Sequence, residues 1–286
     1  MRVVKRLFDF YINSSIHVAV AVLSLVLMTN HMFHNPFDMV MAGFVFFGTI
    51  FGYNFVKYES LFRNRKPIRK RLKAMVFLSL LSFLTAFFCF FELERITQIV
   101  AVVFFGLTFL YTVPFFPNKE NIRNWSGVKI YIVAFCWAGI TILLPLINAG
   151  IAISIDVFLK FGQRFLLVII LILIFEIIDL KTDDPSLMTV PQKIGVKQTK
   201  KLGYILLIIF CGLEFFNSNI NINFNKINGN INFQSMVLQL ALIFAIAIVS
   251  ALFTFFAHPN RSKYYTSFWV ESIPIFWWIL VLIFKK

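Results

Sequence analysis

Apolar runs of about 20 residues recur along the whole of this 286-residue sequence, and they limit its possible folds more than any other feature. A bilayer's hydrocarbon core is about 30 Å thick, which about 20 helical residues cross. The runs cover residues 16–33, 37–56, 74–91, 96–116, 127–147, 157–178, 202–217, 236–257 and 268–284. Only helices and closed barrels satisfy backbone polar groups in lipid. Because the runs are continuous rather than alternating, we expect a transmembrane helix at each.

The composition excludes a soluble globular protein. Hydrophobic residues make up 59% of the chain, charged residues only 14%, and the mean hydropathy is +0.83. No Pro-, Gly- or Ser-rich linker divides the chain, so we predict one transmembrane domain over residues 1–286, all-α and polytopic, with about nine transmembrane helices. The predicted second and sixth helices each end in a polar motif before a basic loop. This indicates pseudo-repeat halves of about 1–125 and 126–286.

Two of the runs are interrupted or short. Lys160 and Arg164 fall at the start of the run 157–178, and the run 202–217 is shorter than the others. We therefore expect tilted helices here, or basic side chains that snorkel to the membrane surface. The Asn-rich stretch from Asn217 to Gln234 predicts an external loop.

Positive charges are distributed unevenly between the two sets of loops. One set holds only Arg95, Lys160, Arg164, Lys226, Lys285 and Lys286, and the rest of the 27 Lys and Arg residues fall on the other. Lys and Arg near helix ends stay in the cytoplasm, so we predict a cytoplasmic N-terminus and cytoplasmic functional loops, in a bacterial-type inner membrane. The net charge of +14 then reflects topology and attraction to membrane lipids. No nucleic-acid-binding module accompanies it, which excludes DNA or RNA as a partner.

Three acids lie at the predicted cytoplasmic end of the helix 157–178. Glu176, Asp179 and Asp183 are spaced i, i+3 and i+7, which places their carboxylates on one helical face. Crowded carboxylates repel one another unless a cation is present. Oxygen ligands at a water-accessible rim suit Mg²⁺, which usually binds substrate phosphate as well. The alternative to a Mg²⁺ site is a helix end with solvated acids offset by nearby lysines.

The loop after the second run is dense in cationic side chains. Residues 63–71 read Arg-Asn-Arg-Lys-Pro-Ile-Arg-Lys-Arg and carry donors suited to a diphosphate. A cytoplasmic anchor on anionic lipids explains the same charges. The three cysteines lie in apolar runs without metal-ligand spacing, so we expect neither a disulfide framework nor a zinc site.

These residues together resemble the UbiA-type intramembrane prenyltransferases. The acidic segment 176–183 is followed by Thr189-Val190-Pro191 and by Ile194-Gly195, where the family has a Thr-Leu-Pro-like step and a Gly after its second Asp-rich motif. The segment Tyr111-Thr112-Val113-Pro114, with Lys119 downstream, is similar to the family's Tyr-Ser-x-Pro segment and its lysine. Helix number, orientation and both charged loops agree over nearly the whole chain.

The resemblance implies a helical bundle around a central cavity. There, Mg²⁺ held by two acidic motifs activates a polyprenyl diphosphate for transfer to a lipid-soluble or aromatic acceptor. It implies Asp179 and Asp183 as catalytic residues and metal ligands, and Glu176 as a third ligand or as a residue that orients them. The implied diphosphate contacts are Asn54, Arg65, Lys66, Lys119 and Arg123.

The first acidic motif departs from the family pattern. Members carry Asn-Asp-x-x-Asp-x-x-x-Asp at the end of the second helix. Here Asn54 is kept, but Phe55, Tyr58 and Phe62 occupy the aspartate positions, with Glu59 nearby. An aromatic ring cannot replace a carboxylate as a Mg²⁺ ligand. The alternative function is therefore a catalytically degenerate member that binds an isoprenoid or lipid, or that assembles with a partner enzyme.

A transporter is a third possibility, and it predicts ionisable residues scattered at mid-depth. Glu214 and Glu271 are the other deep acids, and both lie close to predicted helix ends. A hydrogen-bonded structural or interfacial carboxyl is the favoured interpretation of each.

Overall fold

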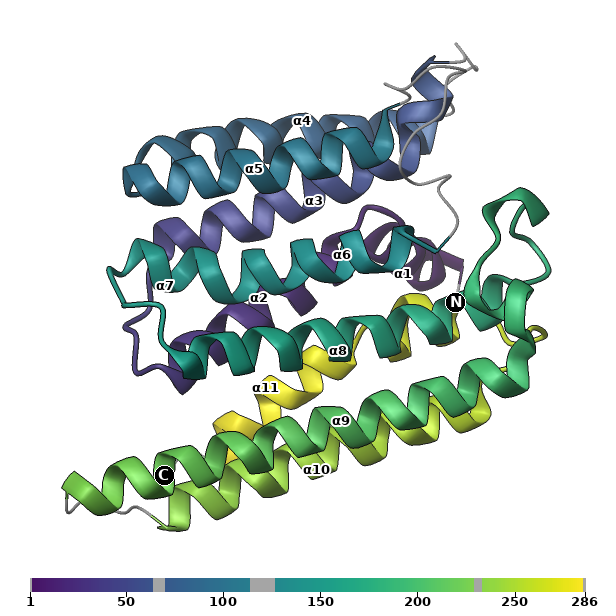
Figure 1. The fold of residues 1–286 in the computed structure, drawn as a ribbon. Coiled ribbons are helices and arrows are strands. Elements are labelled where there is room, and N and C mark those ends of the chain that lie inside the picture. The colour runs from purple at the N-terminus through teal and green to yellow at the C-terminus, as the bar shows by residue number, and fades with distance from the viewer. Residues whose placement is uncertain (1, 64–69, 114–126, 229–232, 285–286) are drawn as a thin grey trace. The chain divides into compact units, whose positions relative to one another are not determined.

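The computed structural model describes residues 2–63, 70–113, 127–228 and 233–284, and these residues form helices joined by short turns, without a strand (Figure 1). The predicted all-α class is confirmed. The helices are α1 (Arg2–Asn13), α2 (Ile16–Met32), α3 (Met39–Arg63), α4 (Lys70–Phe91), α5 (Arg95–Thr112), α6 (Lys129–Ala138), α7 (Leu144–Asn148), α8 (Ile155–Asp179), α9 (Val190–Asn228), α10 (Phe233–Phe256) and α11 (Ile273–Phe284). Two π-helical segments, η3 (Gly139–Leu143) and η5 (Tyr265–Val270), join α6 to α7 and precede α11.

The predicted apolar runs fall on helical residues, apart from a few positions at their ends and a turn at 271–272; residues 114–116 of the run 96–116 lie outside the described residues. Within the described residues, seven segments are long and apolar enough to cross a membrane: Met39–Glu59, Leu72–Phe91, Arg95–Thr112, Lys129–Asn148, Ile155–Asp179, Met236–Phe256 and Tyr265–Phe284. The pair α1 and α2, bent by 55°, meets the same criterion as an eighth. The run 202–217 lies inside α9, which is not among these segments, so the count of nine helices stays a prediction.

Large apolar side chains are exposed along several of these segments. On α4, Phe77 and Phe88 are each 69% exposed, and on α5 Ile96 and Ile99 are each 66% exposed. An apolar surface of this extent is unfavourable in water. It is the surface that a helix presents to lipid acyl chains.

The chain divides into two compact units, which we call unit 1 and unit 2. Unit 1 comprises Met1–Ile132 and Gly139–Ala152, and unit 2 comprises Val133–Ala138 and Ile153–Lys286. The predicted single domain, with halves that meet near residue 125, stays a prediction.

Unit 1 is organised around α2, which packs against α3, η3 and α7. Pro145 explains the local geometry of this contact. Proline has no N–H to donate to the carbonyl four residues earlier, which here is that of Thr141. The hydroxyl of Thr29 on α2 donates to that carbonyl at 2.7 Å. The α-helix is interrupted at η3, and a backbone carbonyl at this interruption forms a hydrogen bond to α2.

One asparagine side chain connects three helix ends in unit 1. The Asn148 amide, at the end of α7, donates to Asp38 Oδ2 at 2.8 Å and accepts from the Glu94 backbone N–H at 3.0 Å. Asp38 Oδ1 in turn accepts the N–H groups of Val40 and Met41 in the first turn of α3. A carboxylate at this position stabilises the helix start.

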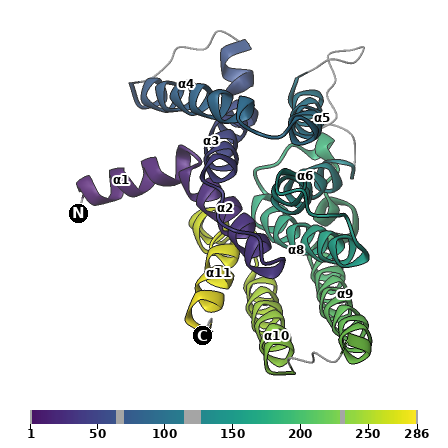
Figure 2. The same ribbon diagram turned by 90° about the vertical axis from the view of Figure 1, so that its left-hand side faces the viewer.

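Unit 2 is organised around α8, which packs against α9 and also contacts α10 and η5. The side chains of Leu167, Ile170, Ile174 and Ile177 on α8 are fully buried. Helices α9 and α10 lie side by side in both views (Figures 1 and 2).

The loop predicted between residues 217 and 234 was wrong for most of its length. Helix α9 continues to Asn228, and α10 begins at Phe233. Once a helix has formed, adding a further residue requires no new nucleation, so the free-energy cost is only that residue's helix propensity. For Asn that cost is about 0.7 kcal/mol relative to Ala. The composition therefore indicated a polar segment correctly, but the inference that a polar segment forms a loop was wrong.

Gly139 in η3 lies against α5. A Cβ at Gly139 would coincide with the ring of Phe104, which is buried. Only a residue without a side chain allows this close approach of η3 to α5.

We expect Gly139→Ala to lower the free energy of unfolding by about 1–3 kcal/mol, because the added methyl overpacks the contact with Phe104. Gly106→Ala on α5 is the matched control, since nothing lies within 4 Å of a Cβ there. Ala is favoured over Gly inside a helix by about 1 kcal/mol, so the control is expected to be neutral or stabilising. Thermal unfolding in detergent measures both variants. Equal midpoints would contradict the packing argument.

Candidate functional site

The acidic motif lies at the end of α8 in unit 2. Asp179 is the last residue of the helix, and its carbonyl accepts the backbone N–H groups of Thr182 and Asp183, each at 2.8 Å. The chain thus makes one further turn beyond the helix, which leaves Asp183 one turn from Asp179. Both aspartates are partly exposed, whereas Glu176, one turn earlier, is buried.

Glu176 joins the end of α8 to the start of α9. Its Oε2 accepts the backbone N–H of Val190, the first residue of α9, at 3.0 Å. A carboxylate at this place also interacts favourably with the positive end of the α9 dipole. The structure therefore gives Glu176 a helix-capping contact that its spacing from the aspartates did not predict.

The start of α9 is set by a capping arrangement. The Thr189 backbone N–H donates to Gln192 Oε1 at 2.8 Å, as in one half of a capping box. The Thr189 hydroxyl is buried and makes no hydrogen bond within the part of the chain that the structure describes. This orphan hydroxyl lies beside Val190, whose N–H binds Glu176.

Gly195 separates this first turn from the rest of α9. Its backbone has φ 77° and ψ 159°, a region open in practice only to glycine. The Ile194-Gly195 step identified in the sequence is therefore a break in the helix. It allows a short capped turn to lie at the acidic end of α8 while the remainder of α9 packs along that helix.

The described residues include no group of three or more His, Cys, Asp or Glu side chains arranged to hold a metal ion. The oxygen donors at the end of α8 nevertheless suit Mg²⁺. This ion is usually bound by one or two carboxylates together with substrate phosphate rather than by an all-protein cage. Asp179 and Asp183 fit that requirement, and their assignment as ligands stays a prediction.

Asn54, the remnant of the first motif, lies buried on α3 in unit 1. Its Oδ1 accepts the Ser15 hydroxyl at 2.9 Å, and its Nδ2 donates to the Ser14 carbonyl at 3.1 Å and to the Ser79 hydroxyl at 2.8 Å. These bonds join the α1–α2 bend to α3 and α4. A contact from Asn54 to a diphosphate would have to replace at least one of them.

Four of the predicted diphosphate contacts lie outside the described residues, namely Arg65, Lys66, Lys119 and Arg123. Of the segment that resembles Tyr-Ser-x-Pro, Tyr111 and Thr112 are buried at the end of α5. Val113 is extended, with φ −86° and ψ 135°. A residue that precedes proline is driven out of the helical region, which explains why α5 ends here.

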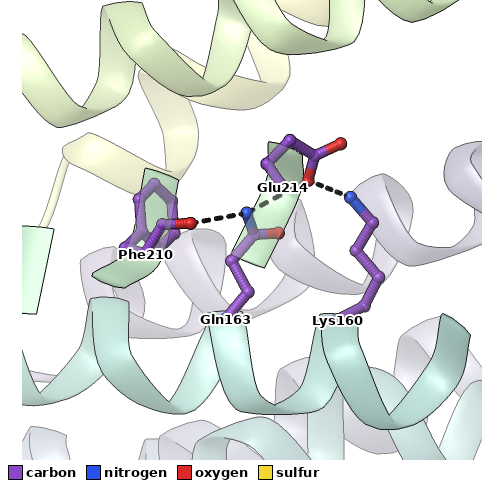
Figure 3. Close-up of polar contacts among 4 residues, drawn as sticks. All are labelled: Lys160, Gln163, Phe210 and Glu214. Atoms are coloured by element: carbon purple, nitrogen blue, oxygen red, sulfur yellow. Dashed lines mark hydrogen bonds and ion pairs between the residues drawn. The ribbon is translucent and has the colours of Figure 1, made fainter. Parts of the chain in front are cut away.

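A second polar cluster in unit 2 contains residues whose pairing the sequence did not show. Lys160 Nζ of α8 forms an ion pair with Glu214 Oε2 of α9, and Gln163 Nε2 donates to the same oxygen at 3.0 Å (Figure 3). Gln163 Nε2 also donates to the Phe210 carbonyl at 3.2 Å. Lys160 is 7% exposed and Glu214 is 1% exposed. The prediction that Lys160 snorkels was therefore wrong, and Glu214 is the structural carboxyl that we expected.

Arg164 extends this cluster toward α11. Its side chain is buried, and the guanidinium lies 5.7 Å from the centroid of the Trp277 ring. Phe210 contacts the same indole edge-to-face at 6.3 Å. A guanidinium over an indole face is a favourable arrangement for a desolvated cation, so Arg164 does not snorkel either. The spacing of Lys160, Gln163 and Arg164 marks one helical face, and this signal could have located the cluster from sequence.

We expect Lys160→Met and Glu214→Leu each to destabilise the protein by about 3–5 kcal/mol, because each leaves a buried charge without its partner. The double variant is expected to recover most of that loss. Lys197→Met, at an exposed position of α9, is the control for removing a lysine. Unfolding in detergent measures the cycle. If the losses of unfolding free energy in the two single variants simply added in the double variant, the energetic coupling of Lys160 and Glu214 would be contradicted.

The fold can be compared with known proteins. No family model matches the sequence, and no curated protein matches it. A UbiA homolog from Archaeoglobus fulgidus bound to GPP and Mg²⁺ matches with a TM-score of 0.65 and 10% identity, over 96% of this chain and 98% of that chain. The same homolog bound to DMAPP and Mg²⁺ matches with a TM-score of 0.64, 10% identity and the same coverage.

A second UbiA homolog, the apo structure from Aeropyrum pernix K1, matches with a TM-score of 0.66 and 14% identity, over 95% of this chain and 99% of that chain. The chain is therefore an integral, multi-pass membrane protein with the fold of UbiA homologs. The resemblance predicted from the motifs is confirmed at the level of the fold. At identities of 10–14%, the comparison concerns the fold alone.

Proposed function

We propose that this protein transfers a polyprenyl group from its diphosphate to a lipid-soluble or aromatic acceptor in a Mg²⁺-dependent reaction. One observation carries the proposal. Asp179 and Asp183 lie one turn apart at the end of a membrane-spanning helix, in a fold shared with a UbiA homolog bound to GPP and Mg²⁺. An acidic helix end of this kind suits a metal–diphosphate complex.

Transfer of the prenyl group requires neutralisation of the negative charge that develops on the leaving diphosphate. Asp179 and Asp183 would hold a Mg²⁺ ion, which would supply that neutralisation. Glu176 acts as a positioning residue, since its bond to Val190 N–H holds the capped start of α9 against the end of α8. Arg65, Lys66, Lys119 and Arg123 donate to the diphosphate oxygens, for which charge-assisted hydrogen bonds are well suited.

The proposed site faces the cytoplasm. The basic residues of the sequence fall mainly on the loops at the N-terminal side of the membrane, and this bias orients multi-pass proteins. We propose accordingly a cytoplasmic N-terminus in a bacterial-type inner membrane.

A second candidate function is isoprenoid binding without turnover, and the end of α3 favours it. The first aspartate position holds Phe55, whose ring stacks with Phe51 at 6.1 Å and with Phe109 at 6.4 Å. The second holds Tyr58, whose hydroxyl donates to the Asn13 carbonyl at 2.9 Å. These side chains offer no carboxylate to a second metal ion. Such a protein would bind the diphosphate and leave it intact.

Turnover is tested with the purified protein, radiolabelled GPP and a total membrane lipid extract as acceptor source. We expect label in an organic-soluble product and release of diphosphate, both only with Mg²⁺. Asp179→Ala is expected to reduce turnover at least about 100-fold, since loss of a metal ligand exceeds the effect of losing an outer partner. Asp184→Asn, an exposed acid beside the motif, is the control and should retain activity.

Calorimetry with a non-hydrolysable GPP analogue separates the two candidates. Mg²⁺-dependent binding that Asp179→Ala removes, without turnover in the wild-type protein, would favour the non-catalytic function. Turnover that Asp179→Ala and Asp184→Asn affect equally would refute the assigned metal ligands.

A further inference from the structure

Helix α1 has two distinct faces, and neither has a role in the proposed reaction. Helical spacing places four side chains on one side of α1, namely Val3, Val4, Leu7 and Tyr11. The opposite side carries Lys5, Arg6, Asp9 and Asn13. A clean separation of apolar and basic residues is typical of helices that lie at a membrane surface.

The apolar face of α1 is largely uncovered within unit 1. Val3, Val4 and Leu7 are 67%, 71% and 65% exposed. Only the last turn of the helix packs closely, where Ile12 is buried and the Tyr11 hydroxyl is hydrogen bonded to His17 Nδ1 of α2 at 2.8 Å. The first two turns project away from α2 and α3 (Figure 2).

The direction of α1 is fixed by the structure that follows it. Between α1 and α2 the chain bends by 55°, and Ser15 occupies the left-handed region at φ 63°. The bend is held by Asn54, which binds Ser14 and Ser15. The helix end is held as well, since the Asn13 carbonyl accepts Lys57 Nζ at 3.3 Å and the Tyr58 hydroxyl at 2.9 Å.

We propose that α1 is an interfacial helix that binds the surface of an anionic membrane. Val3, Val4 and Leu7 insert among the upper acyl chains, and Lys5 and Arg6 contact anionic headgroups. Two observations select a lipid surface as the occupant. Helix α1 is joined directly to α2, with which it meets the length and hydropathy criterion for a membrane span, and the polar face of α1 carries more basic than acidic charge.

A transmembrane position for α1 is disfavoured by its charges and its length. Arg2, Lys5, Arg6 and Asp9 lie within the first eight residues of a helix of 12 residues. Such a helix spans about 18 Å, well short of the hydrocarbon core. Charged side chains at membrane depth are also costly. At the interface the same residues reach water and headgroups while the apolar face is covered. This inference is independent of the proposed reaction.

The test uses the full-length protein in vesicles of phosphatidylglycerol and, separately, of phosphatidylcholine. Cys89, Cys136 and Cys211 are replaced by Ala, because all three are free thiols. A nitroxide is attached to Val4→Cys or to Asp9→Cys, and its collisions with oxygen and with a water-soluble nickel complex are compared. We expect the label at position 4 to favour oxygen, the label at position 9 to favour nickel, and a stronger contrast in phosphatidylglycerol.

Three results would overturn the proposal. Water exposure at both positions would mean a helix free of the membrane. Lipid exposure at both would mean an inserted, broken span. Spin–spin broadening at position 4 would mean that a second copy of the chain covers the apolar face.

Charge reversal supplies the second arm of the test. In the Val4→Cys background, Lys5→Glu with Arg6→Glu is expected to shift the label toward water in phosphatidylglycerol and to leave it unchanged in phosphatidylcholine. Lys197→Glu with Lys201→Glu, at exposed positions of α9, makes the same change of net charge and should have no effect. An equal shift from both pairs, or none from either, would refute the role assigned to the basic face.

Discussion

Inside a bilayer no water completes the hydrogen bonds that a helix leaves open, so polar groups must find partners within the protein. Unit 1 shows this near Pro145, where the Thr141 carbonyl accepts the hydroxyl of Thr29 from α2. Unit 2 shows it at Glu214, which accepts from Lys160 and Gln163 of α8. The helix contacts of both units therefore depend on polar pairing as well as on apolar packing, and each pair fixes one helix against another.

The need for internal hydrogen-bond partners distinguishes the roles of the two polar ends of α8. At the start of the helix, Lys160 and Gln163 are buried and bonded to Glu214, and Arg164 lies over Trp277. These side chains join α8 to α9 and α11. At the other end, Asp179 and Asp183 are partly exposed, and the capped start of α9 is held beside them by Glu176. Acids that remain accessible to water at a helix end, where the macrodipole opposes them, are the better candidates for a ligand site.

Helix content and the approximate ends of the helices could be predicted from the sequence, because runs such as 157–178 and 236–257 exceed the length that lipid requires. The acidic motif could also be found, since three acids at helical spacing stand out in an apolar chain. The partners of Lys160 and Asn54 could not, because they come from helices distant in sequence. The continuation of α9 past Asn217 was missed for a different reason: composition reports polarity, whereas the helix depends on cooperative extension.

The end of α3 connects two features that appear unrelated in the sequence. Where the UbiA pattern places aspartates, Phe55 stacks on Phe109 and Tyr58 bonds to Asn13, while Asn54 binds the serines of the α1–α2 bend. Carboxylates at these positions would repel one another and would offer no donor to the Asn13 carbonyl. Tyr58, at one of the aspartate positions, and the retained Asn54 thus help to hold the end of α1 and the bend that follows it. The proposed Mg²⁺ site would then rely on Asp179 and Asp183 at the end of α8.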